Sequence, residues 1–369
     1  MKTLLDSSVP RLGFGLMRLK ELQNGEIDME LAKKLVDDFM AKGFRYFDAA
    51  YSYLDGRCEG VFKSAVVDRY PRDSYYIATK LPLWGISTKE ECIERVNTSL
   101  SRLGSGYVDF WLLHSLREET LEKAEEIGAW ELMKELKSTG KAKHIGFSYH
   151  DSPEKLDAYL DRHPEAEFVQ LQINYLDWES KNVRARECYE VVRKHGLPVI
   201  IMEPIKGGNL ATGNKEIQAL FGDATPASLA LRWVAEKEGV MMILSGMNDE
   251  AQVAENTDVM ASPIPLTEKE HAALDRAAEI MNSAPRYGCT GCRYCVEGCP
   301  AGILIPRIID FYNDSITYQN YAQTKAGFLR YYTKGMPSAC IGCGQCESVC
   351  PQHLPVPEIM EKAAALLKD

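Results

Sequence analysis

The sequence predicts a (β/α)8 TIM barrel followed by a small, α-rich domain with clustered cysteines. Eight apolar segments of strand length recur between residues 11 and 246, and amphipathic stretches of helix length separate most of them. In addition, eight of the 11 cysteines lie in two short runs near the end of the chain. Strands that are apolar along their whole length are expected to be buried on both faces, as in a parallel sheet covered by helices.

The predicted strands follow one another along the chain at residues 11–17, 44–50, 75–81, 108–114, 143–149, 168–174, 197–203 and 240–246. Helices are predicted between most of them, for example at 28–43, 89–104 and 183–196. Each of these three stretches ends in glycine, which suits a helix C-terminus. Eight strand–helix units in about 250 residues are typical of a TIM barrel. A doubly wound sheet is the alternative, disfavoured because no strand is followed by a convincing G-x-G-x-x-G motif.

The alternation of strands and helices stops near residue 259, which divides the chain into three parts. Residues 1–258 form the predicted barrel, 259–283 a proline-bearing linker and a helix, and 284–369 the cysteine-rich domain. Within this last domain, helices are predicted in the aromatic-rich segment 311–332 and at 357–367.

Composition and charge narrow the range of partners. The formal net charge is -10, and such an acidic protein is expected to be repelled by the phosphates of nucleic acids. No apolar run approaches the ~18 residues that a membrane span needs, and the N-terminus lacks the apolar core of a signal peptide. We therefore expect a cytoplasmic protein that binds neither nucleic acid nor membrane.

Both cysteine runs, "CTGCRYCVEGCP" and "CIGCGQCESVCP", have the spacing C-x2-C-x2-C-x3-C-P. This spacing matches the bacterial ferredoxin pattern, in which the fourth cysteine of each run ligates the cluster of the other run. One [4Fe–4S] cluster is therefore expected on Cys289, Cys292, Cys295 and Cys350, and a second on Cys340, Cys343, Cys346 and Cys299. Structural zinc is the alternative, but zinc sites usually take two cysteine pairs rather than two runs of four.

Polar residues stand at the ends of three consecutive predicted strands. Asp48 ends one strand and Tyr53 follows it, Lys80 lies in the next strand, and His114 ends the strand after that. In a TIM barrel these strand ends share one rim, where catalysis takes place. A lysine lowers the pKa of a nearby tyrosine, and a histidine can orient a substrate oxygen. The four residues together predict proton donation to a carbonyl oxygen.

The segments "FDAAYSY", "ATK" and "YVDFWLLHSL" resemble the catalytic signatures of the aldo-keto reductase family. The resemblance covers roughly residues 9 to 258. It implies a barrel that binds a nicotinamide cofactor without a Rossmann fold. It also implies that Asp48, Tyr53, Lys80 and His114 form a catalytic tetrad with Tyr53 as proton donor. The segments "GFSYH" and "LQINY" nominate Ser148 and Gln172 as contacts of the nicotinamide carboxamide.

Two of the remaining cofactor contacts that the resemblance implies depart from the family. The remaining contacts are Gly15, Gly246, Gln252, Glu255 and Asn256. Glu255 and Asn256 match the family's cofactor loop. Members selective for the 2′-phosphate often carry Lys and Arg where this chain has Gly246 and Gln252. Both NADP(H) and NAD(H) therefore remain open, with a slight preference for NADP(H) from the resemblance. Tyr149 and Met202 also replace residues common in the family.

The whole arrangement resembles a subgroup of aldo-keto reductases with a C-terminal ferredoxin-type domain. We expect an NAD(P)H-linked reductase of a small carbonyl compound, or the reverse oxidation of an alcohol, coupled to electron transfer through two [4Fe–4S] clusters. A ferredoxin or flavodoxin is the expected kind of redox partner. A flavin would bridge two-electron and one-electron steps, although no flavin motif is recognisable. Two alternatives are an enzyme whose clusters are structural or oxygen-sensing, and a non-catalytic redox sensor that binds nicotinamide.

Overall fold

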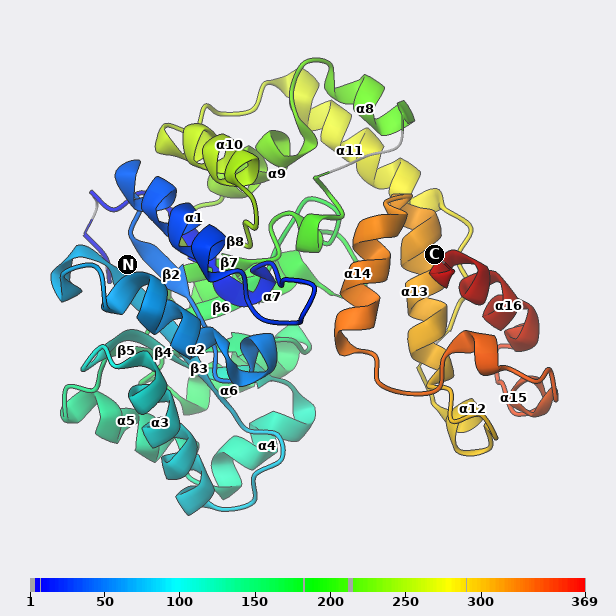
Figure 1. Ribbon diagram of the computed structural model, residues 1–369, viewed down its shortest axis with the longest axis horizontal. Helices are drawn as coiled ribbons and strands as arrows, with labels where there is room; N and C mark the ends of the chain where they lie inside the picture. The colour runs from blue at the N-terminus through cyan, green and yellow to red at the C-terminus, as the bar shows by residue number, and fades with distance from the viewer. Residues whose placement is uncertain (1–3, 7, 182, 212–214, 290, 369) are drawn as a thin grey trace. The chain divides into compact units, whose positions relative to one another are not determined.

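The computed structural model describes residues 4–6, 8–181, 183–211, 215–289 and 291–368. Within these residues, eight parallel strands pair in chain order and close into a barrel (Figure 1). The closure confirms the predicted TIM barrel and excludes the doubly wound sheet. The strands are β1 (Leu12–Gly15), β2 (Tyr46–Asp48), β3 (Tyr76–Pro82), β4 (Val108–Leu116), β5 (Ala142–Tyr149), β6 (Val169–Gln172), β7 (Val199–Met202) and β8 (Val240–Ser245).

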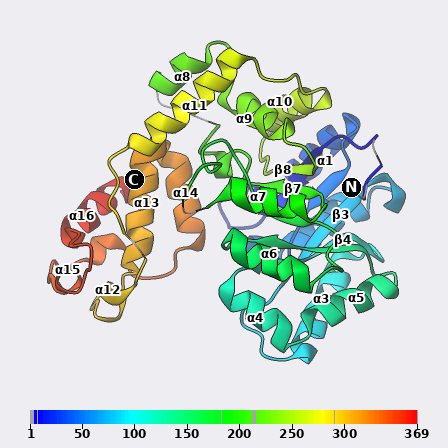
Figure 2. The same cartoon turned by 180° about the vertical axis from the view of Figure 1, so that it is seen from behind.

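Helices surround the barrel, as views from opposite sides show (Figures 1 and 2). The three helices predicted above are α1, α3 and α7. Across the described part of the chain, no helix has the length and apolar character needed to cross a membrane. The helices around the barrel are α1 (Met29–Ala41), α2 (Cys58–Phe62), α3 (Lys89–Leu103), α4 (Glu118–Glu126), α5 (Ala129–Ser138), α6 (Pro153–Arg162), α7 (Ala185–Lys194), α9 (Pro226–Ala235) and α10 (Glu250–Ala261).

Local sequence signals set the bounds of α3, the helix that later bears on the site. Thr88 accepts a hydrogen bond from the amide of Glu91, and the Glu91 side chain accepts from the Thr88 amide, which forms a capping box. Gly104 ends the helix in the left-handed conformation, with φ of 61°. The start and the end of α3 therefore follow from its own residues.

Apolar side chains fill the interior of the barrel. One layer contains Tyr46, Phe110, Phe168 and Met242, all fully buried. Gly13 leaves room for this layer, because a Cβ there would lie only 2.8 Å from the side chains of Tyr46 and Leu244. The barrel is thus a packed core, and polar chemistry is left to the strand ends.

Gly146 in β5 gives a stability prediction. A Cβ at this position would lie 2.4 Å from the carbonyl oxygen of Phe168, which belongs to the backbone entering β6. We expect Gly146→Ala to lower the free energy of unfolding by about 1–3 kcal/mol through overpacking. Urea unfolding of the wild type and the variant measures the change. Gly60→Ala in α2 is the control, because no atom lies within 4 Å of its Cβ position. Equal unfolding midpoints for wild type and Gly146→Ala would contradict the prediction.

The chain divides into two compact units, of which the second contains the cysteine runs. Unit 1 comprises Met1–Ile205 and Ser228–Leu266, and unit 2 comprises Lys206–Ala227 and Thr267–Asp369. The helices of unit 2 are α8 (Lys215–Phe221), α11 (Glu268–Ser283), α12 (Tyr294–Glu297), α13 (Ile305–Tyr318), α14 (Tyr321–Tyr331), α15 (Gln345–Ser348) and α16 (Val356–Leu367).

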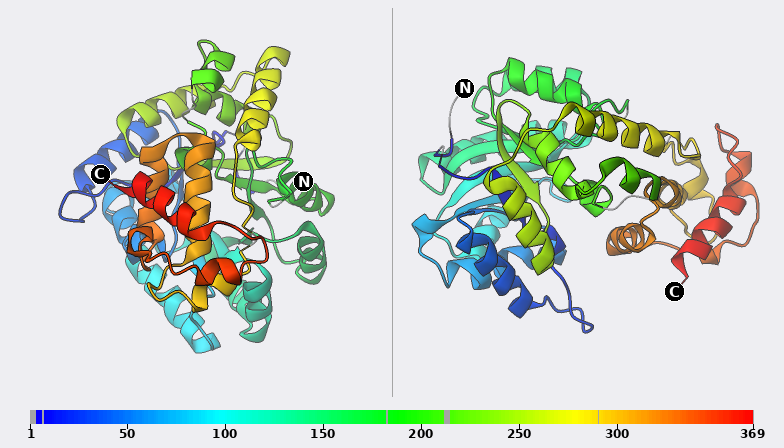
Figure 3. Two further views of the ribbon diagram at one scale, coloured as in Figure 1. Left: turned by 90° about the vertical axis from the view of Figure 1, so that its right-hand side faces the viewer. Right: turned by 90° about the horizontal axis from the view of Figure 1, so that it is seen from above.

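Unit 2 has its own apolar core, built mainly from α13 and α16, which pack against each other (Figure 3). Five cluster cysteines pack against this core: Cys289, Cys295, Cys299, Cys340 and Cys346. The single helical segment predicted at 311–332 is instead divided between α13 and α14. The division occurs because Gln319 has a left-handed φ of 52°, and the Asn320 side chain then caps the start of α14.

Candidate active site

Asp48 and Lys80 form a buried ion pair at the rim of the barrel. Asp48 ends β2, and Lys80 lies two residues beyond the Asp48 register position on the neighbouring strand β3. The Lys80 Nζ atom lies 2.7 Å and 2.6 Å from the two carboxylate oxygens of Asp48, and it donates to the carbonyl of Ala49 at 2.9 Å. Lys80 is fully buried. The pair places a cation and its counter-ion in a buried position.

Tyr53 and His114 complete this group of four. Tyr53 begins the 3-10 turn η2 (Tyr53–Gly56), and the Lys80 Nζ atom lies 4.6 Å from the centroid of its ring. The rings of Tyr53 and His114 meet edge to face with centroids 5.7 Å apart. His114 lies on β4, opposite Pro82 of β3. The structure therefore brings together all four residues that the sequence nominated from separate strands.

The electrostatics of the group follow from burial. Burial raises the pKa of Asp48, and the neighbouring Lys80 opposes that shift. Burial also lowers the pKa of His114 well below its usual value, and the positive charge of Lys80 lowers it further. His114 is therefore a neutral imidazole at neutral pH, which can donate one hydrogen bond to a substrate oxygen. The Lys80 ammonium faces the Tyr53 ring, with 4.6 Å between Nζ and the ring centroid.

The residues nominated for the carboxamide lie at the next two strand ends. Ser148 is buried at the end of β5, and its Oγ accepts a hydrogen bond of 2.7 Å from the amide of Ser115. Gln172 ends β6, and its Nε2 donates to Asp177 at 2.8 Å. With Nε2 engaged in this way, the Oε1 atom of Gln172 can accept from an amide group. Asp177 was not recognised from the sequence.

The residues nominated for the nucleotide end cluster around the end of β8. Gly15 lies in β1 next to this strand end, and Asn256 of α10 is buried with its Nδ2 donating to Ser245 Oγ at 3.0 Å. Gln252 stabilises the start of α10, because its Oε1 atom accepts a hydrogen bond of 2.9 Å from the Asn248 amide. Glu255 follows on the same helix and is partly exposed.

Gly246 follows β8, and the structure places a cation beside it that the sequence analysis missed. The Cδ atom of Arg18 lies 3.2 Å from the position of a Cβ on Gly246. The guanidinium of Arg18 lies 3.5 Å from the carboxylate of Glu203. Phosphate sites in TIM barrels are frequent after strands 7 and 8. Arg18 thus adds a positive charge where Gly246 and Gln252 supply none.

Trp84 also lies at the site and was missed. Its ring centroid is 5.0 Å from that of His114, and 43% of the side chain is exposed. Trp84 follows Lys80 by four residues, in the loop after β3. This position directly after the strand that carries Lys80 is the sequence feature that could have identified Trp84 as a site residue. A large exposed aromatic side chain beside His114 can form an apolar wall for a substrate.

The cysteines of unit 2 line two separate cavities. Each cavity combines three cysteines of one run with the fourth cysteine of the other run. The first is lined by Cys289, Cys292, Cys295 and Cys350, and the second by Cys299, Cys340, Cys343 and Cys346. Apolar side chains, among them Ile305 and Val356, complete both walls. The two donor sets fit one [4Fe–4S] cluster each, because a cubane takes four thiolates.

Two stretches of the chain match models of known protein families. Residues 11–279 match the family model described as "Aldo/keto reductase family", and residues 288–354 match the model described as "4Fe-4S dicluster domain". An aldehyde reductase of Saccharomyces cerevisiae is 28% identical over 294 residues, which cover 71% of this chain and 86% of that protein. The NADH-specific methylglyoxal reductase of Escherichia coli is 24% identical over 328 residues, covering 75% of this chain and 97% of that protein.

A solved structure shares the fold of the barrel. The crystal structure of an aldo-keto reductase from Klebsiella pneumoniae in complex with NADPH superposes with a TM-score of 0.60 at 24% identity. The superposition covers 73% of this chain and 90% of that chain.

Proposed function

Because the chain belongs to the aldo/keto reductase family and is an oxidoreductase that also carries a 4Fe–4S dicluster domain, we propose that it reduces a small carbonyl compound with a nicotinamide dinucleotide and that Tyr53 donates the proton. One observation carries the proposal. The Lys80 ammonium lies between the Asp48 carboxylate, at 2.6 Å, and the Tyr53 ring, at 4.6 Å from its centroid.

Each residue of the group has a defined task in this reaction. Tyr53 gives its phenolic proton to the carbonyl oxygen, and the charge of Lys80 stabilises the phenolate that remains. Asp48 keeps Lys80 charged in its buried position. Neutral His114 donates a hydrogen bond that orients the carbonyl oxygen, and Trp84 forms a wall of the substrate pocket. When bound, a reduced nicotinamide supplies the hydride that the carbonyl carbon accepts.

The nicotinamide dinucleotide would lie along the strand ends that follow His114. Ser148 and Gln172 would hold the carboxamide, and Gly15, Gly246, Gln252, Glu255 and Asn256 would surround the nucleotide end. Arg18 offers these phosphates a positive charge, with its guanidinium now 3.5 Å from Glu203. Either NADP(H) or NAD(H) fits this arrangement.

The two cysteine sets would each hold one [4Fe–4S] cluster, which supplies one-electron exchange with a redox partner such as a ferredoxin or flavodoxin. Reduction of a carbonyl to an alcohol takes two electrons and two protons. A bound NADPH or NADH would supply both electrons and one of these protons as hydride, and Tyr53 would supply the other proton. Two clusters that each carry one electron would then return two electrons, with one proton, to the oxidised nicotinamide. We therefore include coupling between the clusters and the reductase site in the proposal.

The coupling can be tested with protein whose clusters are intact. The protein is kept anaerobic, its clusters are reduced with reduced methyl viologen, and methylglyoxal is added with NADP⁺ or NAD⁺ but without any reduced nicotinamide. Methylglyoxal is a suitable first substrate because one relative is named a methylglyoxal reductase. We expect the clusters to be reoxidised and a matching amount of alcohol to form. If the clusters stay reduced while NADPH or NADH sustains turnover, the clusters are structural or oxygen-sensing and the coupling is wrong.

A further inference from the structure

The loop that carries Tyr53 has a conformation that its own residues do not favour. After Tyr53, Leu54, Asp55 and Gly56 all have left-handed backbones, with φ of 53°, 54° and 82°. For residues with a side chain, this conformation costs about 1–2 kcal/mol each. Contacts from outside the loop must therefore hold Tyr53 in its place beside Lys80.

Arg102 of α3 supplies such contacts. Its Nη1 atom donates a hydrogen bond of 3.2 Å to the carbonyl of Tyr51, and its guanidinium lies 4.6 Å from the centroid of the Tyr51 ring. Its Nη2 atom lies 3.5 Å from the position of a Cβ on Gly56. Arg102 thus touches the loop on both sides of Tyr53 in the sequence.

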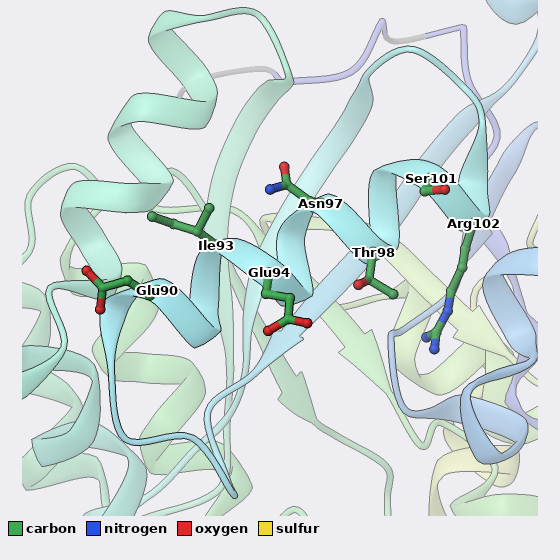
Figure 4. A pocket seen from close by; sticks show the side chains of 7 residues that line it. All are labelled: Glu90, Ile93, Glu94, Asn97, Thr98, Ser101 and Arg102. Atoms are coloured by element: carbon green, nitrogen blue, oxygen red, sulfur yellow. The ribbon is translucent and has the colours of Figure 1, made fainter.

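Figure 4 shows where this arginine comes from. Seven side chains of α3 line a shallow pocket on its outer face, and Arg102 is the last of them along the helix. The guanidinium therefore belongs to a helix that covers the barrel, and it reaches the loop from outside the substrate site. It does not need to touch the substrate to affect Tyr53.

Glu59 extends the same contact to the strand that carries Lys80. Its side chain is fully buried, and one carboxylate oxygen, Oε1, accepts a hydrogen bond of 2.7 Å from Thr79. The other, Oε2, lies 3.7 Å from Nη1 of Arg102. Thr79 directly precedes Lys80 in β3, and neighbouring side chains of a strand point to opposite faces. Arg102 and Glu59 therefore join the Tyr53 loop, α2 and β3 from the outer face of the sheet.

We propose that Arg102 is a positioning residue that holds the phenol of Tyr53 at its distance from Lys80, through the carbonyl and ring of Tyr51 and the buried carboxylate of Glu59. This inference rests on the proposed role of Tyr53. According to this inference, turnover also depends on Arg102, which is not one of the four residues Asp48, Tyr53, Lys80 and His114. Arg102 acts through Tyr53 and not by contact with the substrate or the cofactor.

The principal variant is Arg102→Met, which keeps an unbranched apolar stem and removes the guanidinium. We expect kcat with methylglyoxal to fall by about tenfold to a hundredfold, because small displacements of a catalytic group have effects of this size. The dissociation constants of NADPH and NADH are expected to stay within about twofold, since Arg102 acts on the Tyr53 loop through Tyr51 and Glu59. Glu94→Gln, an exposed neighbour on α3, is the matched control and should leave kcat unchanged.

The division between kcat and nucleotide binding gives a readout that loss of stability would not change. The kcat is expressed per folded molecule, with the folded fraction measured by circular dichroism. In Arg102→Met this kcat should fall, while the dissociation constants of NADPH and NADH stay near those of the wild type. A wild-type kcat per folded molecule would contradict the inference.

A double variant separates positioning from charge balance. Arg102→Met leaves the Glu59 carboxylate buried without its cation, so the variant is less stable for that reason alone. In Arg102→Met/Glu59→Gln this charge is gone, and stability should recover while kcat stays low. Recovery of wild-type kcat in the double variant would overturn the inference, because Arg102 would then only neutralise Glu59.

Tyr51→Leu covers the case in which Arg102→Met does not fold. It removes the ring beneath the guanidinium but keeps the pair of Arg102 and Glu59, and kcat should again fall. Wild-type kcat in this variant and in every Arg102 variant that folds would overturn the inference. If this happens while Tyr53→Phe is inactive, the proposed function stands and only the positioning role fails. Full activity of Tyr53→Phe would instead remove the proposed function.

Discussion

Replacing Tyr53 by phenylalanine is expected to lower the turnover of methylglyoxal by about 10²–10⁴-fold, the range that a general acid contributes. In the proposed reaction the phenol gives a proton to the carbonyl oxygen, and phenylalanine keeps the ring while removing that proton. The ring contact with Lys80, now 4.6 Å from the centroid, can remain. We therefore expect the dissociation constants of NADPH and NADH to change little.

Steady-state kinetics and nucleotide fluorescence titrations with the same protein measure the two effects separately. Tyr107→Phe is a matched control that also removes one phenolic hydroxyl. Tyr107 directly precedes β4, at the end of the barrel away from the catalytic strand ends, and its hydroxyl contacts Lys143 at 3.2 Å. This control should keep full turnover. Wild-type turnover in Tyr53→Phe would show that another group donates the proton.

Protein prepared without oxygen is expected to contain close to eight iron and eight acid-labile sulfide per chain, as two cubanes require. In Cys299→Ala, we expect a selective loss of the cluster whose other ligands are Cys340, Cys343 and Cys346. The reason is that Cys299 lines the same cavity as these three cysteines, although they follow it in the chain by 41 residues or more. The iron content should approach about four per chain, and the spectrum of the remaining cluster should be preserved.

Two companion variants make this result specific. Cys350→Ala should affect the other cluster, because Cys350 lines the cavity of Cys289, Cys292 and Cys295. Cys188→Ala changes a buried cysteine of the barrel and should leave both clusters intact. If Cys299→Ala removed the first cluster instead, the crossed assignment would be wrong. Zinc in place of iron and sulfide would exclude iron–sulfur clusters in both cavities.

Much of the barrel could be predicted because its signals are local. Each strand is largely buried on both faces, so segments such as residues 108–114, apolar apart from Asp109 and His114, can be recognised singly. The ends of α3 follow from Thr88, Glu91 and Gly104 within the helix itself. Asp48, Lys80 and His114 could be nominated because polar residues at the ends of apolar strands are conspicuous.

The division of the aromatic-rich segment at 311–332 was less predictable. Its composition suits one long helix, and no glycine or proline marks the break at Gln319 and Asn320. The break depends on a left-handed φ of 52° at Gln319, a conformation that an ordinary residue adopts only where the surrounding packing favours it. Packing of α13 against both α14 and α16 supplies that context.

The sequence by itself determined the order of the strands, the rim on which Asp48, Tyr53, Lys80 and His114 lie, and the two groups of four cysteines, because these depend on periodicity and on spacing along the chain. Only the tertiary structure decided which distant side chains support them. Arg18 meets Gly246 because β1 pairs with β8 to close the barrel. Arg102 reaches Tyr51, 51 residues away, because α3 packs against α2. Such contacts cannot be recognised from the local sequence. An arginine on a helix surface occupies the same polar position in the sequence whether it faces solvent or contacts a neighbouring loop.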